Sequence, residues 1–154
     1  MKRILLTGMS GTGKSTVIAN LAALGYKAVD LDSEGMCEWD ANGDERWLED
    51  EVQHLLDTEA GDALFLAGCA ENQVKFYPQF DHVVLLSAPA EVIAERVSTR
   101  TNNSYGKDPS EAARILENKR IIEPLLRRTA TLEVDSSAAI DEVTAIILGL
   151  AHRD

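Results

Sequence analysis

The sequence contains little cysteine and no long apolar run. Cys37 and Cys69 are the two cysteines among 154 residues, and neither belongs to a CxxC or Cys/His cluster with the spacing of a zinc site. We therefore expect two reduced thiols in a cytoplasmic protein. No segment approaches the roughly 20 apolar residues that span a bilayer. The apolar residues after Met1 lead directly into a glycine-rich loop, which argues for a strand rather than a signal peptide.

Basic residues are also scarce. The chain has 15 Lys and Arg against 26 Asp and Glu, which gives a formal net charge of −11. Nucleic acids and anionic membranes require a basic face on their partners, so we expect neither as a partner. The length and the 45% hydrophobic content fit one domain with a real core. We therefore predict a single domain over residues 1–154 that acts as a monomer.

Short apolar runs alternate with longer amphipathic segments along the chain. The predicted strands cover 3–7, 27–30, 63–67, 82–86 and 131–134. The predicted helices cover 14–24, 44–56, 90–99, 109–126 and 138–151. This alternation predicts an α/β fold of three layers, with a parallel sheet of about five strands and helices on both faces. Right-handed crossovers bring the carboxyl ends of the strands to one edge, where ligands bind.

A glycine-rich segment between the first strand and the first helix fits G-x-x-x-x-G-K-[ST] at every fixed position. Glycines let main-chain amides converge on phosphate oxygens, and the helix start adds its positive dipole. Lys14 brings a cation to the β- and γ-phosphates, and the Ser15 hydroxyl can ligate Mg²⁺. We therefore predict that ATP and Mg²⁺ bind at Gly8, Met9, Ser10, Gly11, Thr12, Gly13, Lys14, Ser15 and Thr16.

Polar residues follow other predicted elements at the same edge. Asp30-Leu31-Asp32 ends the second strand, and strand alternation points its two carboxylates the same way. Leu66-Ala67-Gly68-Cys69-Ala70 ends the third strand, and Arg96 and Arg100 share one helix face before a polar loop. Together with the phosphate loop, these segments resemble the small P-loop kinases of metabolites. That group includes shikimate kinases, gluconokinases and nucleoside monophosphate kinases, and the resemblance covers nearly the whole chain.

The resemblance implies a P-loop NTPase fold that carries a short lid at about 101–108 and an acceptor-binding region at about 31–62. It implies an ATP-dependent phosphotransferase in which Asp30 joins Ser15 in holding Mg²⁺. Asp32 would contact the acceptor hydroxyl and receive its proton, and a lid-side arginine would clamp the transferring phosphoryl oxygens. The catalytic residues on this interpretation are Lys14, Asp32 and Arg100.

The resemblance also implies binding roles for residues further along the chain. Arg96 would lie against the adenine, and Asp135 and Ser136 match the strand end and loop that flank adenine in these kinases. On the acceptor side, the expected contacts beside the catalytic aspartate are Gly68, Cys69 and Arg120.

The resemblance weakens where these kinases choose their acceptor. Shikimate kinases hold a carboxylate with arginines at places that Leu48 and Ile122 occupy here, and their triple glycine is Gly68-Cys69-Ala70 here. Shikimate is therefore not the expected substrate. Between residues 31 and 62, twelve acids accompany one arginine, Arg46, a balance that disfavours a phosphate dianion.

We therefore expect a neutral or cationic hydroxyl acceptor, such as a nucleoside, a polyol or an aminoglycoside-like compound. Trp39 has two possible roles: a solvent-exposed side chain, or one that stacks on an aromatic acceptor. The alternatives are a nucleoside monophosphate (adenylate-like) kinase and a gluconate-type sugar-acid kinase. Outside the kinases, the alternatives are an ATP hydrolase or switch and a non-catalytic nucleotide-binding module, because all of these share the phosphate loop.

Overall fold

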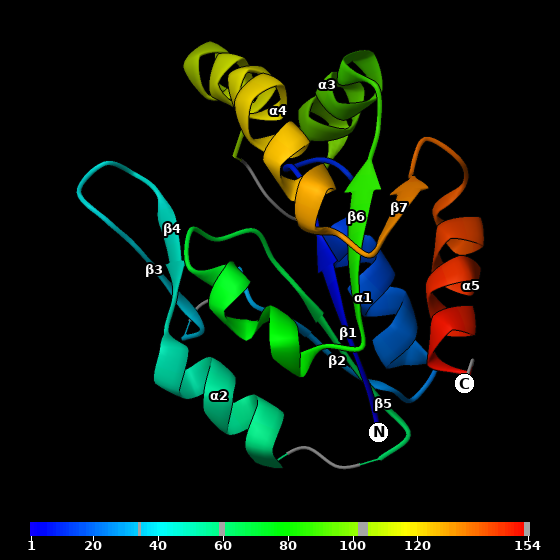
Figure 1. The fold of residues 1–154 in the computed structure, drawn as a ribbon. Helices are drawn as coiled ribbons and strands as arrows, with labels where there is room; N and C mark the ends of the chain where they lie inside the picture. Colours follow the sequence, from blue (N-terminus) through cyan, green and yellow to red (C-terminus); the bar gives the residue numbers. More distant parts are fainter. Residues whose placement is uncertain (34, 59–60, 102–104, 153–154) are drawn as a thin grey trace.

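The computed structural model describes residues 1–33, 35–58, 61–101 and 105–152. Its centre is a five-stranded parallel sheet in the order β2-β5-β1-β6-β7 (Figure 1). The strands are β1 Lys2–Thr7, β2 Lys27–Asp30, β5 Ala63–Ala67, β6 His82–Ser87 and β7 Leu132–Asp135. This arrangement confirms the predicted α/β fold and places the strand before the phosphate loop in the middle of the sheet.

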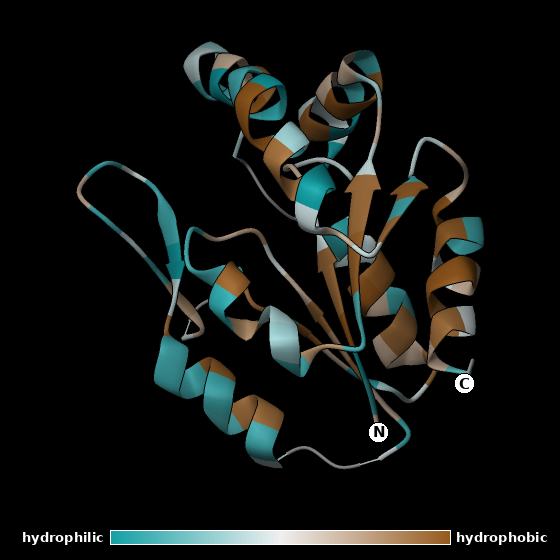
Figure 2. Ribbon diagram, in the orientation of Figure 1, coloured by the Kyte–Doolittle hydropathy of each residue, from teal (hydrophilic) through white to brown (hydrophobic). Residues whose placement is uncertain are grey.

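Helices cover both faces of the sheet (Figure 1). They are α1 Lys14–Ala23, α2 Glu49–Thr58, the 3₁₀ helix η1 Gln73–Gln79, α3 Ala90–Thr99, α4 Pro109–Thr129 and α5 Ile140–Ala151. Strand alternation decides which side chains meet which layer. Ile4 and Leu6 pack with α1 and α5, whereas Leu5 packs with α2 and η1. Figure 2 accordingly shows β1 and β6 as almost continuously hydrophobic, as expected for strands buried on both faces.

The helix predicted over 44–56 is wrong in its first turn. Cys37–Trp39 (β3) and Glu45–Trp47 (β4) instead form an antiparallel hairpin, and α2 begins at Glu49. The Gly43 amide donates to the Asp40 carbonyl at 3.0 Å, and Gly43 has a φ of 78°. An Asn-Gly pair favours such turns because glycine adopts positive φ without strain. Cross-strand pairing therefore replaces the first turn of the predicted helix.

The segment after α3 supplies the N-terminal cap of α4, the longest of the described helices. The Asp108 carboxylate caps α4 by accepting from the Ser110 amide at 2.8 Å, and Pro109 occupies the first turn, a position that tolerates proline. The helix continues through Pro124 to Thr129, beyond the predicted end at 126. Of the predicted lid, residues 102–104 lie outside the described residues. Among the described helices, none combines the length and hydropathy of a membrane span.

Candidate active site

The phosphate loop curls tightly between β1 and α1. Gly8 has a φ of 146°, and a Cβ at this position would lie 2.4 Å from the Leu86 carbonyl oxygen. Only glycine fits there, because the backbone conformation and the contact with β6 both exclude a side chain. The Thr12 hydroxyl braces the turn by donating to the Met9 carbonyl at 2.8 Å. The sequence motif therefore has the backbone shape that it predicts.

Lys14 is folded back onto this loop. Its Nζ donates to the Gly8 carbonyl at 2.6 Å and to the Met9 carbonyl at 3.0 Å, and its side chain is buried. Main-chain carbonyls therefore hold the ammonium group against the loop. A phosphate on the loop amides would meet this charge directly, which suits a lysine that neutralises β- and γ-phosphate oxygens.

Two oxygen-bearing side chains, those of Ser15 and Asp30, meet where β2 ends beside α1, and the backbone of Asp32 joins them. The Ser15 hydroxyl donates to Asp30 Oδ2 at 2.9 Å, and the Asp32 amide donates to Asp30 Oδ1 at 3.0 Å. A hydroxyl and carboxylates are the hard oxygen ligands that Mg²⁺ prefers. Ser15 and Asp30 therefore fit the magnesium ligands predicted from the sequence, and Asp32 lies directly beside them.

Glu45 joins this group from the hairpin. Burial, together with the hydrogen bond to Asp32 and its charge, raises the pKa of Glu45 to about 10, despite the opposing charge of Lys14. Glu45 Oε2 is buried and has no hydrogen-bond partner among the described residues. Glu45 was not among the predicted site residues, because the apolar spacing placed 44–56 in a helix. The Asn42-Gly43 turn signal was the available clue.

Gly68 follows the carboxyl end of β5 and lies against Trp47 of the hairpin. A Cβ there would lie 2.9 Å from Trp47 Nε1 and 3.0 Å from Asp32 Oδ1. The next residue, Cys69, donates its amide to Asp32 Oδ1 at 3.4 Å, and burial raises the pKa of its thiol. The structure therefore brings Gly68 and Cys69 to Asp32, and their predicted contact with the acceptor stays a prediction.

Arg100 connects the phosphate loop to the residues before α4. Its Nη2 donates to Ser10 Oγ at 3.2 Å and to the Tyr105 carbonyl at 2.5 Å. Partial burial lowers the pKa of the guanidinium. The predicted phosphoryl-clamping arginine therefore lies at the loop, on the side that faces α3 and α4.

The predicted adenine residues also come together. The Arg96 guanidinium donates to the Ser136 carbonyl and, at 3.4 Å, to Ser136 Oγ. The Asp135 carboxylate accepts from the amide and hydroxyl of Ser137 at 2.9 and 2.6 Å, and these bonds lower its pKa. The loop after β7 is thereby fixed against α3, beside the start of α1.

The model of one protein family, described as AAA domain, matches residues 4–117. The chain belongs to this family. No curated protein sequence matches the chain significantly. The matched range includes the phosphate loop, the hairpin and Arg100.

Solved structures of similar fold include several small P-loop kinases. Shikimate kinase from Acinetobacter baumannii in complex with shikimate is 22% identical, with 97% of this chain and 92% of that chain covered at a TM-score of 0.67. A gluconokinase from Sinorhizobium meliloti is 22% identical, with 99% and 92% covered and a TM-score of 0.62. The YorR protein of Bacillus subtilis, in complex with phosphorylated GDP, is 21% identical, with 98% and 96% covered and a TM-score of 0.64. These likenesses establish a P-loop kinase-like fold.

Among the predicted site residues, Arg120 does not join the others. Arg120 is exposed on α4, where it forms an ion pair with Glu117 at 2.5 Å, and it contacts no other predicted site residue in the described part of the chain. Thr16 is exposed on the first turn of α1. The helical position of Arg120 was correct, but its side chain points along the outer face of α4 rather than toward Asp32.

Proposed function

We propose that this chain is an ATP- and Mg²⁺-dependent kinase that transfers the γ-phosphoryl group to a hydroxyl of a small neutral or cationic molecule. The observation that carries the proposal is the convergence of phosphate-binding and proton-accepting groups. Lys14 and Arg100 contact the loop, while the Ser15 hydroxyl reaches Asp30 and, through Asp30, the backbone of Asp32. A site that only bound nucleotide would not require the Asp32 carboxylate as a proton acceptor.

The proposed reaction is an in-line displacement at the γ-phosphorus. The acceptor oxygen forms the new P–O bond, the bond to the β–γ bridging oxygen breaks, and ADP leaves. The acceptor proton passes to the Asp32 carboxylate. Magnesium held by Ser15 and Asp30 would neutralise phosphate charge, and Lys14 and Arg100 would stabilise the oxygens of the transferring group. Positioning and electrostatics supply most of the rate in such reactions.

The charge of the acceptor side supports a neutral or cationic acceptor. Asp32 lies in this region beside Glu45, whose raised pKa of about 10 leaves the charge of the pair on Asp32 near neutral pH. Arg46, the one arginine between 31 and 62, is already paired with Glu49 at 3.1 Å. Within residues 31–62, a dianionic phosphate or a sugar acid would have to compete with Glu49 for Arg46, whereas an acceptor hydroxyl can donate to the Asp32 carboxylate.

Product analysis tests the proposal. The protein is incubated with ATP and Mg²⁺, with and without nucleosides, polyols, aminoglycosides, nucleoside monophosphates, gluconate and shikimate. We expect ADP formation to rise at least about tenfold with a neutral or cationic hydroxyl compound, with one phosphorylated product per ADP. A monophosphate phosphorylated much faster than its nucleoside would refute the acceptor class. Slow ATP loss that no acceptor changes would point to a hydrolase or switch.

A further inference from the structure

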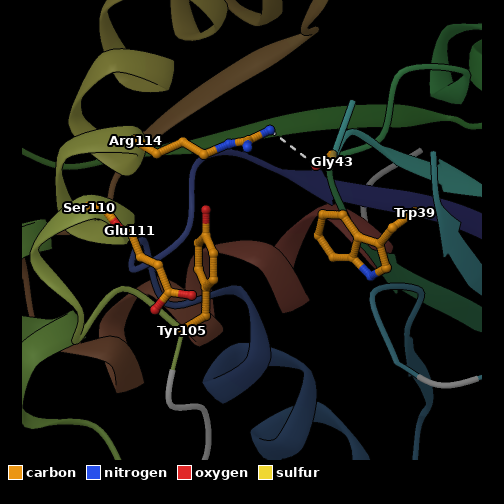
Figure 3. Close-up of a pocket in the computed structure, with 6 residues that line it drawn as sticks. All are labelled: Trp39, Gly43, Tyr105, Ser110, Glu111 and Arg114. Atoms are coloured by element: carbon orange, nitrogen blue, oxygen red, sulfur yellow. Dashed lines mark hydrogen bonds between the residues drawn. The ribbon is translucent and has the colours of Figure 1, made fainter. Parts of the chain in front are cut away.

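A cavity of about 450 Å³ opens between the hairpin and the start of α4 (Figure 3). Its lining residues are Trp39, Gly43, Tyr105, Ser110, Glu111 and Arg114. Cavities of roughly 300–1,000 Å³ accommodate metabolite-sized ligands. Trp39, which the sequence left open to stacking on an aromatic acceptor, lines this cavity. None of the predicted catalytic, nucleotide-binding or metal-binding residues does, so the cavity adds a compartment to the site described above.

Two aromatic side chains form opposite walls of the cavity. Figure 3 shows the indole of Trp39 and the ring of Tyr105 on either side of the open space. The Trp39 side chain is 64% exposed, although indoles are usually covered in folded proteins. Tyr105 packs against the cluster of Ile93, Val97 and Ile115, so its wall is anchored by α3 and α4. An open indole facing an anchored phenol is suited to receive a flat ring.

The hairpin connects this cavity to the proposed site of transfer. Trp39 on β3 lies directly opposite Glu45 on β4, and directly opposed residues of antiparallel strands project from the same face. Glu45 is hydrogen-bonded to Asp32. On the other wall, the Tyr105 carbonyl accepts from Arg100, which also contacts Ser10 of the phosphate loop. The two cavity walls are therefore connected to the proposed proton acceptor through Glu45 and to the phosphate loop through Arg100.

Polar groups surround the aromatic walls. Arg114 donates to the Gly43 carbonyl at 3.1 Å and lies 3.6 Å from the Asp44 carboxylate, so it ties α4 to the tip of the hairpin. Glu111 accepts from the Gly106 amide at 3.2 Å through one oxygen. The cavity therefore offers hydrogen-bonding groups near a stacking platform, a combination that favours a ring with N–H and carbonyl edges over a plain hydrocarbon.

We propose that this cavity binds the planar heteroaromatic ring of the acceptor, stacked on Trp39, while a hydroxyl of the same molecule reaches Asp32. This inference rests on the proposed kinase function and narrows its acceptor to a nucleoside-like compound. Polyols and aminoglycosides lack a ring that could use the two aromatic walls.

Binding measurements test this inference without requiring turnover. The full chain, saturated with Mg²⁺ and a non-hydrolysable ATP analogue, is titrated with adenosine, cytidine or ribose by calorimetry and by tryptophan fluorescence. We expect at least one nucleoside to bind and to change the emission, and ribose to bind much more weakly. Saturation with the ATP analogue keeps adenosine out of the nucleotide site.

Substitutions at Trp39 test whether the nucleoside ring stacks on this side chain. Stacking of one base on an aromatic side chain accounts for roughly tenfold or more in affinity, so Trp39→Ala should weaken nucleoside binding by about that factor. Trp39→Phe retains a ring and should stay within about threefold of the parent. Leu24→Ala, a change at an exposed apolar residue at the end of α1, is the matched control and should have no effect.

The outcomes separate this inference from the proposed function. Nucleoside binding that depends on Trp39, with no phosphorylation of any acceptor, supports the cavity assignment and refutes the kinase. Phosphorylation of a ring-free acceptor with a KM unchanged in Trp39→Ala supports the kinase and overturns the cavity assignment. Failure of both nucleosides to bind, or equal affinity in Trp39→Ala, also overturns it.

Discussion

The Glu45 carboxyl group is hydrogen-bonded to Asp32, and its pKa is raised to about 10. Glu45 lies on β4 of the hairpin that follows β2, and the Glu71 amide, in the segment after β5, donates to the Glu45 carbonyl at 3.0 Å. Burial makes a second negative charge unfavourable there. The pair therefore holds a proton near neutral pH, and Asp32 faces the acceptor region with a neutral partner behind it.

This pairing predicts a pH-dependent stability. Because the pKa of Glu45 rises from 4.5 to about 10 on folding, the folded chain keeps a proton that the unfolded chain releases. Stability from this group is complete below about pH 4.5 and declines as the pH rises toward 10. Glu45→Gln, which cannot ionise, should therefore melt at a higher temperature than the parent, by about 3 °C or more near pH 9 and not at all near pH 4.

The matched control for this measurement is Glu38→Gln, on the exposed, opposite face of the same hairpin. Its melting temperature should follow the parent across the pH range. A Glu45→Gln gain that was equal at every pH would contradict the proton held by Glu45.

Replacing Lys14 tests the role of its charge. Lys14→Met keeps the length of the side chain and removes the ammonium that contacts the Gly8 and Met9 carbonyls. Loss of one preorganised charge contact to the transition state commonly lowers kcat by about 100-fold or more, so we expect at least that loss in steady-state kinetics. Circular dichroism and melting should show a folded chain. Normal turnover in this variant would refute the assignment.

Arg100 should matter for turnover more than for ground-state binding. Arg100→Ala removes the contacts to Ser10 and Tyr105, and we expect kcat to fall about 100-fold or more because the charge acts on the transferring group. Arg128→Ala, an exposed arginine in the last turn of α4, is the control and should keep the parent kcat. Equal rates in the two variants would remove Arg100 from the mechanism.

Gly68 should tolerate no side chain. In Gly68→Ala the new Cβ would press on Trp47 Nε1 and Asp32 Oδ1 at 2.9 and 3.0 Å, and overpacking of this kind costs about 1–3 kcal/mol of stability. Turnover should fall with it because Asp32 is displaced. Gly149→Ala in α5 meets nothing within 4 Å and should instead stabilise the chain by about 0.5–1 kcal/mol. Denaturant unfolding of both variants measures the contrast.

The parts of this chain that local patterns specify were predictable from the sequence. The apolar runs of β1 and β6 and the glycine-rich loop each carry their own signal, so the sheet, its helices and the position of Lys14 followed directly. The Asn42-Gly43 pair signalled the turn, but the contact of Glu45 with Asp32 and the position of Trp39 across from Tyr105 were not predictable, because both depend on where the hairpin lies in space. The alternation over Glu45–Trp47 spans three residues, too few to outweigh the helical spacing that continues through α2.

For Arg120, the sequence predicted the helix but not the direction of the side chain. The sequence correctly placed it on a helix, but helical periodicity alone could not distinguish an inward face from an outward one. An ion pair with Glu117, one turn earlier, holds its side chain on the outer face.

Calorimetric titration of Mg·ATP into the parent chain and into Lys14→Met tests the central claim most directly, because every proposed step requires a triphosphate on the Gly8–Ser15 loop. The account predicts saturable binding to one site in the parent that is at least about tenfold weaker in Lys14→Met. The absence of binding of any purine triphosphate to the parent in the presence of magnesium would contradict it.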